Sequence, residues 1–137
     1  MYKFVEHTAD IAIEVYGKTV EELFRNATLA FRDAFVFPEK VKGEEKREIT
    51  VKLEGESEEE KLEYALYDWL NELLYLFDAE HFAALDVKVK VDGEVKGELK
   101  GGKLSSEAVK VEPKAITLHK FKVEKNDFYK AFFIVDI

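Results

Sequence analysis

Apolar and polar residues alternate along several short segments, and this two-residue period is typical of strands with one covered face. The pattern predicts strands at residues 2–5, 11–15, 49–53, 85–91, 94–100, 115–123 and 129–137. Asp92-Gly93 is interpreted as a hairpin turn between two of them, and Gly101-Gly102 as a second turn. Residues 132–135 are continuously apolar, so we expect the last strand to be buried on both faces.

Two longer segments repeat apolar residues with the 3.6-residue period of an amphipathic helix. The first follows a capping-box pattern at Thr19 and Glu22, and we expect it to end before Pro38. The second begins with the same pattern at Ser57 and Glu60 and extends to about Phe77. These elements predict an α+β fold, with residues 1–137 as a single domain in which two amphipathic helices pack on a largely antiparallel β-sheet.

Composition narrows the class of protein. The chain has 137 residues and no cysteine, which excludes disulfides and thiolate chemistry, and we expect a cytoplasmic location. Its 29 acidic and 21 basic residues give a formal net charge of −8, so no direct nucleic acid binding is expected. No apolar run reaches the roughly 20 residues of a membrane span. The many Glu and Lys residues are typical of thermophilic proteins.

The most informative residues lie at the end of the last predicted strand. Asp136 follows a buried apolar segment, and the α-carboxylate of Ile137 lies next to it. A third carboxylate, Asp10, belongs to a polar loop between the first two predicted strands. If the end strands are neighbours, these three groups form one negative site that suits a hard divalent cation such as Ca²⁺. The composition alone leaves that adjacency open.

Other candidates carry weaker signals. His7 precedes Asp10 by three residues, which allows a role in catalysis or in positioning a ligand, although a lone histidine is more often structural. His81 and His119 are not in the spacing of a zinc hydrolase. Lys114 lies after Pro113, at the start of a predicted strand. One interpretation gives it a functional role, and the other makes it an exposed lysine that protects a sheet edge. Phosphate-binding loops and nucleophile elbows are absent from the sequence.

The acidic run at residues 54–63 contains six glutamates and one lysine. One interpretation is a solvated helix N-terminus, which the helix dipole favours. The other is a docking face for a basic partner, such as an enzyme that binds nucleic acid.

Three short motifs resemble those of the archease family: His-Thr-Ala-Asp-Ile at residues 7–11, Lys-Ala-Ile-Thr at 114–117 and Ile-Val-Asp-Ile at 134–137. The resemblance extends over both predicted helices. It departs from the usual pattern at Ala12, where glycine is common, and at Pro113, where valine is common.

This resemblance implies a non-enzymatic, metal-binding cofactor that activates an RtcB-type RNA ligase in tRNA splicing. Such a protein promotes guanylylation of the ligase, allows multiple turnover and broadens nucleotide use. The resemblance further implies that Asp10, Asp136 and the Ile137 carboxylate hold a divalent cation, with Ca²⁺ as the expected ion, and that Lys114 is required.

Two other functions remain open from the sequence. The first is a small metal-dependent hydrolase of a phosphorylated substrate, with His7 as acid or base. The second is a general chaperone or interaction module with an incidental cation site, which would use the acidic helix face.

Overall fold

The computed structural model describes residues 1–6 and 10–137. Its helices and strands follow in this order: β1 (Tyr2–Glu6), β2 (Asp10–Gly17), α1 (Val20–Phe35), η1 (Pro38–Lys40), β3 (Lys42–Lys52), α2 (Glu58–Ala79), β4 (Phe82–Val91), β5 (Glu94–Lys103), η2 (Ser106–Ala108), β6 (Ala115–Ile116), β7 (Lys122–Lys125) and β8 (Tyr129–Asp136).

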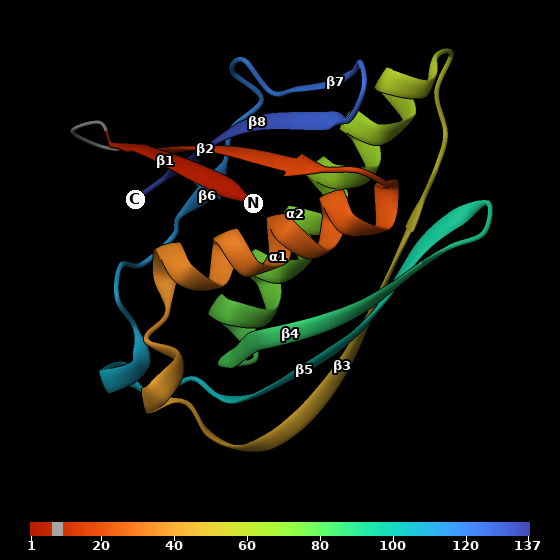
Figure 1. Cartoon of the computed structure of the whole chain (residues 1–137). Coiled ribbons are helices and arrows are strands. Elements are labelled where there is room, and N and C mark those ends of the chain that lie inside the picture. The colour runs from red at the N-terminus through yellow and green to blue at the C-terminus, as the bar shows by residue number, and fades with distance from the viewer. Residues whose placement is uncertain (7–9) are drawn as a thin grey trace.

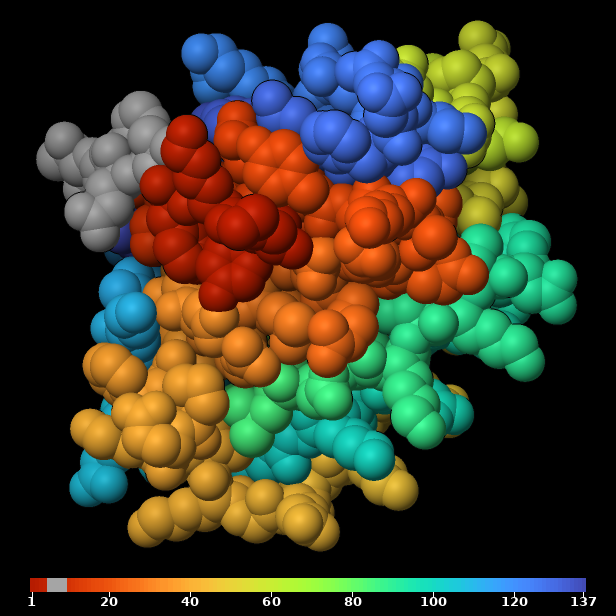
Figure 2. Space-filling view, viewed as in Figure 1, coloured from red at the N-terminus to blue at the C-terminus, as the bar shows by residue number. Residues whose placement is uncertain are grey.

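The strands form two antiparallel sheets, with the helices between them (Figure 1). One sheet has the order β1-β2-β8-β6, with β7 also paired to β8, and the other has the order β3-β5-β4. Helix α1 contacts β2 and β4, and α2 contacts β3 and β7, so each helix joins both sheets. Figure 2 shows β1 and β2, in red and orange, over the middle of one face, next to the blue β7–β8 region. The predicted α+β architecture is confirmed, although its strands are divided between two sheets.

The predicted helix boundaries are confirmed by their caps. The Thr19 Oγ1 accepts a hydrogen bond from the Glu22 backbone N–H at 3.1 Å, and Ser57 Oγ accepts one from Glu60 at 3.1 Å. These side chains satisfy N–H groups that have no partner within the helix. Helix α1 ends at Phe35, before Pro38.

The core is organised around Trp69 of α2, which is fully buried. Its ring contacts the edge of Phe24 from α1, with centroids 5.3 Å apart. Its Nε1 donates to the Thr28 hydroxyl at 2.9 Å, and that hydroxyl donates to the Phe24 carbonyl at 2.9 Å. On the sheet side, the ring occupies the position where a side chain of Gly97 would lie. The helices and the three-stranded sheet therefore share one core, in which the Trp69 N–H and the Thr28 hydroxyl both have hydrogen-bond partners.

The prediction of a turn at Gly101-Gly102 is wrong, because both glycines continue β5. A Cβ on Gly101 would overlap the carbonyl oxygen of Ala83 in β4, and one on Gly102 would lie 2.5 Å from the Lys42 carbonyl oxygen in β3. These glycines permit a close backbone approach on both sides of the central strand.

The prediction of one strand over residues 115–123 is also wrong. The segment forms β6, then a turn, and then β7. The Phe121 N–H donates to the Leu118 carbonyl at 3.2 Å, and Lys120 has a φ of 58°. A left-handed residue interrupts an extended strand. The apolar alternation changes phase at the same place, from Ile116 and Leu118 to Phe121 and Val123.

Glutamates at the start of α2 cap the outer edge of β7. The Val123 N–H donates to Glu63 Oε2 at 3.0 Å, and the Lys125 N–H donates to Glu59 Oε2 at 3.2 Å. Residues four apart on a helix are about 6 Å apart along its axis, and alternate strand residues are separated by about 6.7 Å, so the two rows match. Part of the acidic run therefore has a structural role that neither interpretation of the sequence included.

We expect Glu63→Ala to lower the free energy of unfolding by about 1–3 kcal/mol, because the Val123 N–H loses a charged acceptor. Glu72→Ala is the matched control, since Glu72 is exposed on the same helix. Denaturant unfolding of both variants measures the difference. Equal stability of the two variants would show that the glutamate cap contributes nothing.

Candidate carboxylate site

The ladder of the five-stranded sheet brings Asp10 and Asp136 together. Asp10 of β2 is the direct cross-strand partner of Asp136 of β8, and Ala115 of β6 pairs with Asp136 from the other side. Figure 1 shows this end of β8 between β2 and β6. The adjacency that the sequence left open is therefore present. Directly opposed residues share a sheet face, so the two carboxylates lie on the same side.

Asp10 carries a polar atom without a partner. Its Oδ1 is buried and accepts no hydrogen bond from any group in residues 1–6 or 10–137. A buried carboxylate oxygen in this state is unfavourable unless a proton donor or a cation compensates it. The Asp10 side chain therefore fits a bound cation.

Glu14 lies on the same face of β2, four residues further along, and its environment differs. The Tyr16 hydroxyl donates to Glu14 Oε2 at 2.8 Å, and Lys130 Nζ lies 3.6 Å from Oε1. This hydrogen bond, followed by the positive charges of Lys130 and Lys3, lowers the pKa of Glu14 below its usual value. Glu14 is thus stabilised as an anion by protein groups, whereas no group among the described residues hydrogen-bonds the buried Asp10 oxygen.

The structure also shows where Lys114 and Ile137, two other predicted site residues, lie. The backbone N–H of Lys114 donates to the Asp136 carbonyl at 2.7 Å, so Lys114 is anchored beside Asp136 while its side chain is exposed. The Ile137 side chain is partly buried against the core. His7 lies outside the described residues.

Side chains alone do not complete a metal centre in the described part of the chain. Within residues 1–6 and 10–137, no group of three or more His, Cys, Asp or Glu side chains is placed to hold a metal ion. His81 lies at the start of the three-stranded sheet, and His119 lies in the turn before β7. The carboxylate pair therefore needs further oxygen donors, such as a main-chain carboxylate or waters.

Sequence reasoning missed Thr117, which follows β6. Its Oγ1 is buried and has no hydrogen-bond partner in the part of the chain that the structure describes, and its N–H donates to the Ile134 carbonyl at 3.0 Å. In the sequence, Thr117 lies two residues after Ala115, at the start of a predicted strand. This spacing places both residues on the same strand face and could have indicated Thr117 as a site residue.

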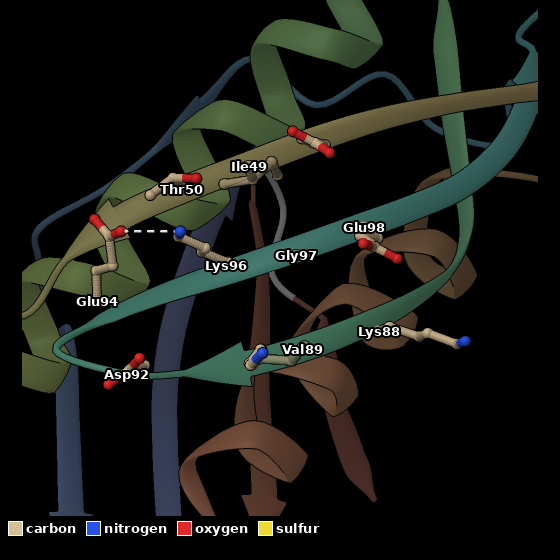
Figure 3. A pocket seen from close by; sticks show the side chains of 11 residues that line it. Ile49, Thr50, Lys88, Val89, Asp92, Glu94, Lys96, Gly97 and Glu98 are labelled. Carbon is tan, nitrogen blue, oxygen red and sulfur yellow. Dashed lines mark ion pairs between the residues drawn. The ribbon is translucent and has the colours of Figure 1, made fainter.

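A hollow of about 740 Å³ lies elsewhere, on the outer face of the three-stranded sheet (Figure 3). Lysines and carboxylates alternate along its walls, and Lys96 Nζ lies 3.4 Å from Glu94 Oε1. Glu48 lies directly opposite Glu98, and Lys90 lies opposite Lys96. Such a mixed surface is typical of a solvated sheet face and does not favour one sign of ligand charge.

Neither helix in the described residues has the length and hydropathy needed to cross a bilayer. The fold and the site together define a class: a small α+β protein with two sheets around two helices and a carboxylate pair at an open sheet end.

Comparison with known proteins identifies the family. Residues 2–137 match the archease protein family (MTH1598/TM1083). The chain is 59% identical to the protein archease of Archaeoglobus fulgidus, over 99% of this chain and 98% of the relative, and 43% identical to that of Pyrococcus furiosus, over 90% and 88%. The chain belongs to the archease family.

Solved structures agree with this assignment. The solution structure of Methanobacterium thermoautotrophicum protein 1598 has a TM-score of 0.69 and 29% identity, over 99% of this chain and 98% of that one. A crystal structure from Thermotoga maritima, described as an archease and possible chaperone, has a TM-score of 0.63 and 28% identity, over 100% and 98%.

Proposed function

We propose that this protein is a non-enzymatic cofactor that activates an RtcB-type RNA ligase in tRNA splicing by promoting guanylylation of the ligase. Family membership supports the class of function. The observation that carries the proposal is the Asp10–Asp136 pair, in which Asp10 has a buried and unpartnered oxygen.

In this proposal Asp10 and Asp136 hold a divalent cation, with Ca²⁺ as the first candidate because every donor is a hard oxygen. The main-chain carboxylate of Ile137 adds a third negative group in a chain that ends there. When bound, the cation supplies positive charge for a phosphate on which negative charge develops. The exposed Lys114 side chain adds a second positive charge at the same sheet end.

An accessory protein accelerates a step only if it favours the reactive arrangement of its partner over the resting one. The open sheet end is suited to this role, because Asp136 is the last residue of β8 and the exposed Lys114 immediately precedes β6 beside it. The net charge of −8 favours approach to a basic, RNA-binding ligase and disfavours direct contact with RNA.

A chaperone role is the second candidate, because the similar Thermotoga maritima structure is described as a possible chaperone. In that case the carboxylate pair would be incidental to the activity, and aggregation of a client protein would be the quantity that changes.

Formation of the ligase–GMP intermediate tests the proposal. A cognate RtcB-type ligase is incubated with labelled GTP and a divalent cation, with and without this protein. We expect faster and more complete labelling of the ligase with the protein present. Unchanged labelling by folded protein would contradict ligase activation, and phosphate release from small substrates by this protein alone would favour the hydrolase instead.

A further inference from the structure

Unpartnered buried side-chain oxygens are concentrated at one end of the five-stranded sheet. In the described residues three such atoms occur: Asp10 Oδ1, Ser105 Oγ and Thr117 Oγ1. Asp10 and Thr117 lie on the strand segments that flank the end of β8 on its two sides. Two of the three unsatisfied atoms thus flank Asp136.

The register places Thr117 on the face that carries the carboxylates. Thr117 is opposite Ile134, because its N–H donates to the Ile134 carbonyl at 3.0 Å, and Ala115 is opposite Asp136. Residues two apart on a strand point to the same face, so Thr117 is a diagonal neighbour of Asp136. Diagonal Cα atoms are about 7–8 Å apart, a separation that two ligands to one Ca²⁺ can span with side chains.

A buried hydroxyl with partners is found in the helical core. Thr28 is almost fully buried, and its hydroxyl both accepts from Trp69 and donates to the Phe24 carbonyl. The hydroxyl oxygens of half-buried Thr117 and of Ser105 have no such partner in the described residues, and the Thr117 oxygen, which lies beside the carboxylates, requires a reason. A cation beside Asp136 supplies one, because a threonine hydroxyl is a neutral oxygen ligand.

We propose that the Thr117 hydroxyl is a further oxygen ligand of the divalent cation, on the β6 side of Asp136. This inference rests on the proposed cation site. The Thr117 hydroxyl is a neutral ligand, in addition to the negatively charged Asp10 and Asp136. It fixes the position of the cation across β8. Thr117 thus extends the site over three adjacent strand segments.

Calcium binding by the full chain tests this inference, with calorimetric affinity and the calcium-dependent rise in Tm as readouts. We expect roughly tenfold weaker binding for Thr117→Val, a loss of the size seen when metal-site support is removed. Thr117→Ser keeps the hydroxyl and should bind like wild type. Thr50→Val, on the outer face of the three-stranded sheet, is the matched control and should also bind like wild type.

Calcium-free protein separates a ligand role from a structural one. Without calcium, Thr117→Val should be at least as stable as wild type, because it removes an unsatisfied buried hydroxyl. Unchanged calcium affinity in Thr117→Val, together with a loss in Asp136→Asn, would overturn the Thr117 inference and leave the cation site intact. No calcium binding by wild type would overturn both.

Discussion

Gly101→Ala will destabilise the protein by about 3 kcal/mol, at the upper end of the usual cost of overpacking. The added Cβ would overlap the carbonyl oxygen of Ala83 and lie 3.0 Å from Cζ of Phe82. A backbone carbonyl in a paired strand cannot rotate away as a side chain does, so β4 and β5 must separate locally. With a total stability of roughly 5–15 kcal/mol, this loss is a large share.

The measurement is thermal and denaturant unfolding, in which a fall in Tm of about 10 °C is expected. Lys100→Ala is the matched control on the same strand, because the Lys100 side chain is exposed, and it should change stability by less than about 0.5 kcal/mol. If Gly101→Ala is as stable as this control, the close approach of β4 to β5 is wrong.

Asp136→Asn will abolish most of the stimulation of the ligase while leaving the fold intact. The substitution keeps the size of the side chain but removes one negative charge from the pair with Asp10, and a neutral amide oxygen is a weaker ligand for a hard cation. The backbone of Asp136 continues to pair with Asp10 and Ala115, so the sheet end should remain formed. The rate of ligase guanylylation at saturating protein is the readout.

Asp127→Asn is the matched control, because it removes the same charge near the other end of β8, where Asp127 precedes the strand in an exposed turn. It should stimulate the ligase like wild type. Equal stimulation by Asp136→Asn and Asp127→Asn would exclude the Asp136 carboxylate from the mechanism. Equal losses would indicate that total charge matters rather than the site.

The sequence predicted those parts of the fold that depend on local chemistry. The caps at Thr19 and Ser57 and the end of α1 before Pro38 follow from hydrogen bonds and backbone geometry within a few residues. Gly101 and Gly102 permit close contact with strands that are distant in the sequence. Two consecutive glycines favour a turn when only their sequence neighbours are considered. At the left-handed Lys120 the apolar positions change phase, from Ile116 and Leu118 to Phe121 and Val123, so a local signal for this turn was present in the sequence.

The candidate site likewise combines features that are visible in the local sequence with features that depend on long-range pairing. Asp10 and Asp136 stand out in the sequence as carboxylates at the ends of apolar segments, but their adjacency depends on the pairing of the first long strand with the last. The buried hydroxyl of Thr117 is visible only after β6 is placed beside β8. The glutamate cap on β7 also requires the tertiary arrangement, because Glu63 and Val123 are far apart in the chain.

The proposed function requires that an RtcB-type RNA ligase turns over repeatedly when this protein is present. The most direct measurement is the number of RNA joints formed per ligase molecule in excess RNA and GTP, with and without untagged protein. We predict many joints per ligase with the protein and far fewer without it. The same yield in both reactions, from a protein shown to be folded, would contradict activation of the ligase by this protein.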